Sequence, residues 1–160
     1  MITRAALLTA VAALAASPAL PQVNPRGEAK ATLAGKTVAV EYGRPSLKGR
    51  DMLGQAQVGQ TWRLGADSAT TLKTEADLAF GSATVPMGEY ILTATKVAAD
   101  EWQLNVAARD RTKVAAIPLT MGKVGQTVET FTIEITGERD KGEFSMMWGD
   151  TALRASFTAN

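Results

Sequence analysis

The sequence predicts an all-β protein, an antiparallel two-layer β-sandwich, with a jelly-roll-like or partly closed barrel as the alternative. From Lys30 onward, apolar and polar residues alternate with a period of two, which is typical of strands that bury one face. No helical pattern of useful length follows the first residues. The segments between turn signals number roughly eight or nine, which suits a sandwich or a barrel. Because one face is apolar and the other is rich in Thr and Glu, the sandwich is favoured.

The first residues differ from the rest of the chain. Arg4 precedes an uncharged apolar run of about twelve residues, Ala5 to Ala16, which is short for a membrane span of roughly 20 residues. Small residues and a proline follow it, so we predict a secretory signal peptide. Cleavage is expected before Leu20, with a second choice before Ala16. The predicted location is therefore the periplasm or the cell exterior, with no membrane span after cleavage.

These observations divide the chain into three parts: a signal peptide over residues 1–19, a flexible lead-in over 20–28, and a single β domain over 29–160. The mature part is long enough for one core and too short for two complete domains.

The first predicted strands form hairpins. KATLA and KTVAVEY are joined at Ala34-Gly35, a plausible tight turn. Further along, EYILTAT and WQLNV are joined through residues 98–101. Each strand alternates apolar and polar residues, which predicts one buried and one solvated face.

The C-terminal third has the clearest alternation. TFTIEIT places Phe131, Ile133 and Ile135 on one face. EFSMMWGD and ALRASFT continue the pattern, and Gly149-Asp150 between them has the glycine-first form of a two-residue hairpin turn. The sequence thus predicts a meander of three antiparallel strands.

Composition excludes several classes of chemistry. The chain has no cysteine and no histidine, so it lacks disulfides, the usual zinc, copper and non-haem iron ligands, and Ser-His-Asp or Cys-His nucleophiles. Removing Arg4 with the signal reduces the 17 basic residues to 16, which equals the 16 acidic residues. A neutral mature chain gives no electrostatic case for nucleic acid. We expect no metal and no cofactor.

Two loops interrupt the regular pattern and supply the candidate ligand-binding residues. The first, EYGRPSLKGRDMLG, has an extended residue before its proline and a glycine that allows a tight turn. The second, TWRLGADSATTL, places a tryptophan and an arginine on opposite faces of a strand. The candidates from the two loops are Arg44, Lys48, Arg50, Trp62, Arg63 and Asp67.

These motifs give the chain a resemblance to a known family. GRPSLKGRDMLG, then TWRLGADSATTL, then VPMGEYIL, with a late Trp-x-Asp-Thr, is similar to the bacterial domain of unknown function 2911 (DUF) family. The resemblance implies an exported bacterial protein and assigns no activity. This chain departs from the family pattern at Asp67, where an asparagine is usual; a carboxylate only accepts hydrogen bonds, which favours an ion pair with Arg63 or Arg50. The residues interpreted as structural are Gly65, Thr70, Gly88, Tyr90 and Trp148.

Each candidate also has a structural interpretation. Trp62 is most simply a core residue, and Arg63 can clamp loops by donating to backbone carbonyls as readily as it can hold an anion. The carboxylates that could form a glycosidase pair across a cleft are Glu41, Asp51, Asp67 and Glu89.

The leading interpretation is a non-catalytic binding or accessory module of the bacterial envelope. Its arginine-lined loops would hold a small anionic or polar ligand, or an envelope protein. One alternative is a glycosidase-like hydrolase with paired carboxylates. The other is a structural envelope protein whose arginines are internal clamps.

Overall fold

The computed structural model describes residues 24–160. The predicted signal peptide lies outside these residues, as does the lead-in up to residue 23. The first strand begins at Arg26, so the last three residues of the predicted lead-in, 26–28, belong to a strand. Within 24–160 the chain contains no helix that is long and apolar enough to cross a membrane.

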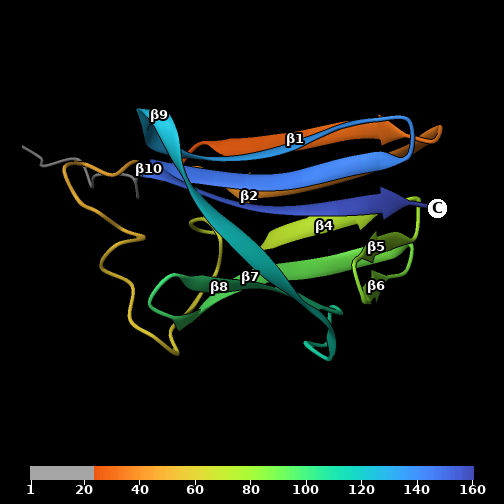
Figure 1. The fold of residues 1–160 in the computed structure, drawn as a ribbon, viewed down its shortest axis with the longest axis horizontal. Helices are drawn as coiled ribbons and strands as arrows, with labels where there is room; N and C mark the ends of the chain where they lie inside the picture. The colour runs from red at the N-terminus through yellow and green to blue at the C-terminus, as the bar shows by residue number, and fades with distance from the viewer. Residues whose placement is uncertain (1–23) are drawn as a thin grey trace, which may run out of the picture.

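The described residues form an all-β structure, as predicted (Figure 1). Its strands are β1 (Arg26–Leu33), β2 (Lys36–Gly43), β3 (Thr61–Trp62), β4 (Thr70–Thr74), β5 (Leu78–Phe80), β6 (Ala83–Val85), β7 (Gly88–Ala98), β8 (Glu101–Ala107), β9 (Lys113–Glu138) and β10 (Lys141–Ala159).

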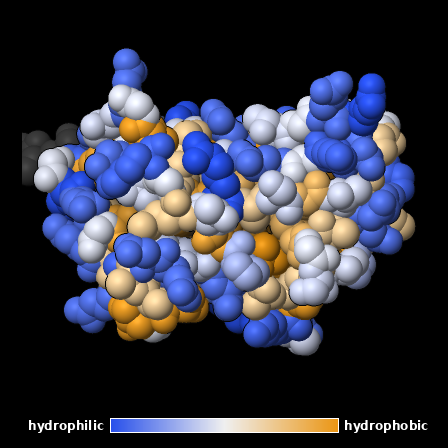
Figure 2. All heavy atoms as spheres, in the orientation of Figure 1, coloured by the Kyte–Doolittle hydropathy of each residue, from blue (hydrophilic) through white to orange (hydrophobic). Residues whose placement is uncertain are grey.

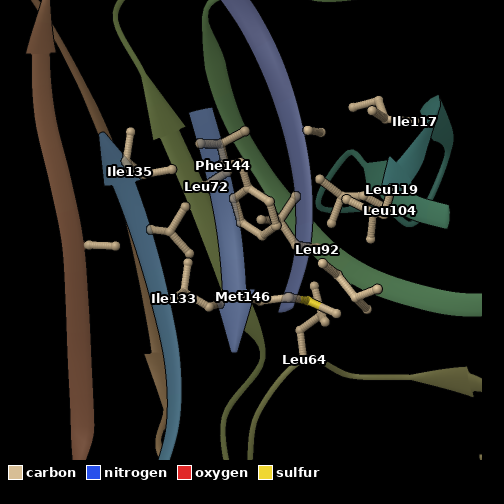
Figure 3. Close-up of a cluster of buried hydrophobic side chains, with 14 of the residues drawn as sticks. Leu64, Leu72, Leu92, Leu104, Ile117, Leu119, Ile133, Ile135, Phe144 and Met146 are labelled. Carbon is tan, nitrogen blue, oxygen red and sulfur yellow. The ribbon is translucent and has the colours of Figure 1, made fainter. Parts of the chain in front are cut away.

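All the strands belong to one antiparallel sheet in the order β1-β2-β4-β7-β8-β9-β10-β5-β6, with β3 also paired to β7. Because β1 and β6 end this order, the sheet is not closed into a barrel. It folds back on itself: side chains of β2, β4, β7 and β8 share an interior with those of β5, β9 and β10. Figure 3 shows buried side chains from both halves meeting between the strands.

Strand β9 joins the two halves of the sheet. Its first part, Lys113–Leu119, pairs with β8, and from Thr120 onward it pairs with β10. In Figure 1 it crosses the molecule diagonally in front of the other strands. A single strand of 26 residues therefore serves both halves.

The predicted hairpins are confirmed at two places. β1 and β2 are joined at Ala34 and Gly35, whose φ angles of 50° and 75° are those of a tight hairpin turn. β7 and β8 are joined at residues 99–100. The predicted inward face of β9 is also confirmed, since Phe131, Ile133 and Ile135 are all buried.

The predicted hairpin at Gly149-Asp150 is wrong. β10 is continuous from Lys141 to Ala159, and Gly149, with φ of 66°, lies where the register against β9 shifts. A glycine with positive φ can mark a register shift within a continuous strand as well as a turn. The predicted meander of three strands is therefore two long strands.

This irregularity explains why the buried positions change parity along β10. Before it the large buried side chains have even numbers, as in Phe144 and Trp148, and after it they have odd numbers, as in Leu153 and Phe157. The positive φ of Gly149 interrupts the extended conformation, so the alternation of the two faces shifts by one residue there. Both segments of β10 thus face one core.

Candidate functional site

The segment that follows β2 is bound to β9. The Leu47 N–H donates to the Glu129 carbonyl at 2.9 Å, and the Phe131 N–H donates to the Pro45 carbonyl at 2.9 Å. Between these bonds, Ser46 forms an isolated bridge with Thr130. The first part of the arginine-containing loop is therefore a short extension of the sheet, which fixes where the rest of the loop begins.

Arg44 is a clamp between this segment and β9. The side chain is half-buried. Its Nε donates to the Phe131 carbonyl at 3.3 Å, and its Nη2 donates to Thr132 Oγ1 at 3.2 Å. A guanidinium that donates to acceptors on a neighbouring strand braces the fold.

Lys48 and Arg50 occupy a turn at the surface, and both are exposed. Lys48 and Gly49 have φ angles of 50° and 77°. The backbone N–H and the Nε of Arg50 donate to the Leu47 carbonyl at 3.1 and 3.2 Å. The Arg50 side chain thus closes its own turn.

The TWRLGADSATTL stretch wraps tightly over the end of β2. A Cβ on Gly65 would lie 2.8 Å from the Gly43 carbonyl oxygen, and one on Gly43 would lie 2.1 Å from the Ala66 carbonyl oxygen. Gly65 also has φ of 148°, so the close contact and the backbone conformation each require a glycine at this position. Thr70 is fully buried, and its Oγ1 donates to the Leu64 carbonyl at 2.5 Å. The structure thus places Gly65 and Thr70, which the sequence analysis interpreted as structural, where the two backbone segments cross.

Arg63 and Asp67 complete the same turn without forming an ion pair. Arg63 is exposed, and its Nη1 donates to the backbone carbonyl of Asp67 at 2.8 Å. The Asp67 carboxylate accepts hydrogen bonds from the backbone and side-chain nitrogens of Asn24, at 2.9 and 3.3 Å. The Arg44, Arg50 and Arg63 side chains donate to three different backbone carbonyls.

Gly88 and Tyr90 form a separate turn structure at the start of β7. The Tyr90 hydroxyl donates to the Pro86 carbonyl at 2.6 Å, and a Cβ on Gly88 would lie 3.3 Å from that hydroxyl. These two residues brace the turn before β7.

An aromatic cluster lies where β2, β3, β9 and β10 meet. Phe131 is its centre, with none of its surface exposed. The Trp62 ring centroid is 4.8 Å from that of Phe131 and 5.4 Å from that of Trp148, and the two indoles are stacked with an interplanar angle of 17°. Tyr42 contacts Phe131 edge-on at 5.6 Å. Trp62 faces inward, while its neighbour Arg63 is exposed.

A pocket of about 220 Å³ opens beside this cluster. Trp62 of β3, Trp102 of β8 and Trp148 of β10 form one side, and these are all three tryptophans of the chain. The loop between β2 and β3 supplies the other side through Met52, Leu53, Gln55, Ala56 and Gln60. We call this the tryptophan pocket. None of the described residues that line it has an ionisable side chain.

The loop side of the tryptophan pocket is tied to β7. The Gly59 N–H donates to the Lys96 carbonyl at 2.7 Å, and the Lys96 N–H donates to the Gln60 carbonyl at 3.2 Å. Lys96 Nζ donates to the Ala56 carbonyl at 3.0 Å. These bonds hold the loop over the pocket although the loop contains no strand.

Apolar surface also surrounds this part of the molecule. Val58 of the loop and Val97 of β7 are exposed to 61% and 43%, and each lies next to a residue of the Gly59–Lys96 hydrogen bond. Figure 2 shows a hydrophobic surface at the end of the molecule where, in Figure 1, the loop approaches the β7–β8 turn.

The displaced pKa values lie away from the tryptophan pocket. The pKa values of Glu75, Asp110 and Asp150 are lowered, mainly because each carboxylate accepts hydrogen bonds from a nearby donor. Burial raises the pKa of Tyr90. Residues 24–160 also contain no group of three or more His, Cys, Asp or Glu that could hold a metal ion.

The structure brings together only some of the predicted site residues. Trp62, a predicted ligand contact, and Trp148, predicted as structural, both line the tryptophan pocket, whereas the lining includes no arginine or lysine. The sequence interpretation missed the five loop residues, because that loop has no periodic pattern. The alternation of WQLNV gave no signal that Trp102, near the start of that strand, borders an opening.

Comparison with known proteins identifies a family without an assigned activity. A family model described as Protein of unknown function (DUF2911) matches residues 24–157, nearly all of the described chain. No curated protein and no solved structure matches the chain.

We predict that Gly43→Ala lowers the free energy of unfolding by at least the 1–3 kcal/mol that overpacking costs, because its Cβ meets backbone atoms of Ala66 at about 2–3 Å. Gly125→Ala is the control, since a Cβ there meets nothing within 4 Å; its effect should stay within about 0.5 kcal/mol. Urea denaturation of both variants measures the difference. Equal stability of the two variants would refute the close contact.

We predict that Arg44→Ala and Arg63→Ala differ in stability. Removing Arg44 leaves two half-buried acceptors on β9 without their donor and should cost about 1–3 kcal/mol. Arg63 is exposed and bonds a carbonyl within its own turn, so its removal should cost less than about 1 kcal/mol. Thermal unfolding of both variants, with and without phosphate, tests this. A larger loss for Arg63, or phosphate stabilisation that only the parent protein shows, would contradict the assignment.

Proposed function

The chain belongs to the family described as Protein of unknown function (DUF2911), and we propose that it is an exported, non-catalytic binding or accessory module of the bacterial envelope. In this proposal the tryptophan pocket holds a small polar but uncharged ligand, or an uncharged group of an envelope protein. Residues 1–19 contain a basic residue, then an apolar run, and then small residues. This order supports export to the periplasm or beyond.

The observation that carries the proposal is the chemistry of the pocket lining. Binding sites are typically concave and largely apolar, with a few polar groups that orient the ligand. The tryptophan pocket has this composition: aromatic and aliphatic side chains, together with the two amides of Gln55 and Gln60. A charged ligand group would find no counter-ion among these residues and would lose its hydration. The proposal therefore requires that the group inside the pocket be neutral.

The volume of the pocket is smaller than that of a site for a large ligand. Its volume of about 220 Å³ lies below the roughly 300–1,000 Å³ of sites for drug-sized molecules. A single ring or a single side chain is the appropriate size. This limits the proposal to a small molecule, or to one group that projects from a larger partner.

The arginine-lined site expected from the sequence receives less support. The Arg44 side chain donates a hydrogen bond to β9, that of Arg50 to its own turn, and that of Arg63 to the turn at Asp67. Lys48 and Arg50 are exposed on the loop that leads into the pocket wall. In the proposal they contribute to the surroundings of the site and not to its lining.

The hydrolase alternative receives no support from the candidate carboxylates. Asp51 accepts the Gly54 N–H at 2.9 Å, and Asp67 accepts from Asn24. Glu89 pairs with Arg109 on the surface, and Glu41 is exposed on β2. None of these four residues lines the tryptophan pocket. A binding role without acid–base catalysis fits this distribution better.

We predict that uncharged probes perturb the intrinsic fluorescence of the chain and that their charged analogues do not. Every tryptophan lines the pocket, so this emission reports on the pocket directly. The matched pairs are methyl glucoside with glucuronate, and benzyl alcohol with benzoate. At least one neutral member should give a saturable change, and its anionic partner a much weaker one.

A variant with a filled pocket supplies the control for this prediction. Ala56→Phe adds a ring to the lining and should abolish the change. Ala116→Phe adds the same ring to β9 at a half-exposed position that is not part of the lining, and it should leave the change intact. Tighter binding of the anionic probes, or an unaltered response in Ala56→Phe, would overturn the proposal.

A further inference from the structure

We propose that the group held in the tryptophan pocket is the ring of a neutral pyranose sugar, which lies against Trp62 and donates and accepts hydrogen bonds at the loop amides. This inference rests on the proposed binding function and names the ligand class of the same site.

The accessible aromatic surface of the pocket belongs mainly to Trp62. Trp102 and Trp148 are only 3% and 4% exposed, whereas Trp62 is partly exposed. One face of Trp62 is covered, because its indole stacks on that of Trp148 at 5.4 Å. The Phe131 ring also contacts Trp62, at 4.8 Å, so a ligand meets only the part of the indole that Trp148 and Phe131 leave open. That geometry suits a ring that presents one apolar face.

The opposite wall is polar at two positions. Gln55 and Gln60 are both on the loop and both line the pocket. The Gln60 Oε1 accepts the backbone N–H of Gln57 at 3.1 Å. This bond fixes the orientation of the amide, so that its NH₂ group is the part left to donate to a ligand.

A pyranose ring matches both walls at once. Its C–H groups form an apolar face for the indole, and its hydroxyl groups around the edge can both donate and accept hydrogen bonds. Gln55 and Gln60 are exposed, and a purely aromatic or aliphatic ring would displace water from their amides without replacing those hydrogen bonds. The uncharged lining selects neutral sugars over uronic acids and sugar phosphates.

The size of the pocket agrees with one sugar unit. Its volume of about 220 Å³ equals the space of roughly seven water molecules in the liquid. One six-membered ring with its hydroxyl groups fits that space, and a chain of several units does not. The pocket would therefore take a terminal or single sugar and not the middle of a polymer.

The test is a fluorescence titration of the parent chain and of Gln60→Leu. The probes are the methyl glycosides of glucose, galactose, mannose and N-acetylglucosamine, with benzyl alcohol and cyclohexanol as neutral rings of other chemistry. At least one glycoside should bind the parent chain more tightly than the two other rings. Gln60→Leu should weaken that glycoside by about three- to tenfold, the value of one hydrogen bond, without weakening benzyl alcohol.

Gln57→Leu is the matched control, because its side chain lies on the same loop outside the lining and only its backbone N–H holds Gln60. It should bind the glycoside like the parent chain. If benzyl alcohol or cyclohexanol binds better than every glycoside, or if Gln60→Leu leaves the glycoside unaffected, the sugar assignment fails while the proposed neutral pocket stands. If no neutral probe of any kind binds, the proposed function fails with it.

Discussion

The packing around Phe131 is the contact on which the rest of the structure depends. The chain has no cysteine, so burial and not cross-linking must hold the two halves of the folded sheet together. Phe131 lies on β9, the strand that serves both halves, and is fully buried against Tyr42, Trp62 and Trp148. Its backbone also binds the segment after β2, through the Pro45 carbonyl and the Arg44 side chain. One position thus fixes the core, the start of the loop and the back of the tryptophan pocket.

The residues of the sequence motifs and the residues of the pocket therefore have different roles. Gly43, Gly65 and Thr70 allow two backbone segments to cross at the end of β2, and this crossing sets the position of the strand that carries Trp62. Arg44 secures the loop to β9. None of these four residues lines the pocket. They hold the walls in place, while uncharged side chains from the tryptophans and the loop form the surface that a ligand would meet.

The sequence predicted the parts of this arrangement that follow from local pattern. Alternation revealed the strands and the inward face at Phe131, and the Ala34-Gly35 turn was recognisable from two residues. Gly149 was misread because a positive-φ glycine serves a bulge as well as a turn, and only the partner strand decides which. The continuity of β9 was missed because its exposed middle section lacks alternation. The partners of Arg44 lie 87 and 88 residues away along the chain, so no local pattern could separate a clamp from an anion site. The loop wall of the pocket has no period at all.

The location of the binding site is the central claim, and two-dimensional NMR of the uniformly ¹⁵N-labelled chain tests it most directly. Methyl glucoside, benzyl alcohol and sodium phosphate are added in separate titrations, and the shifted amide and indole N–H signals are mapped onto the structure. The account predicts that a neutral probe shifts the tryptophan indoles and the backbone amides of residues 52–62, and that phosphate leaves these signals in place. Shifts caused by phosphate and centred on Lys48, Arg50 and Arg63, with no response of the indoles to either neutral probe, would contradict it.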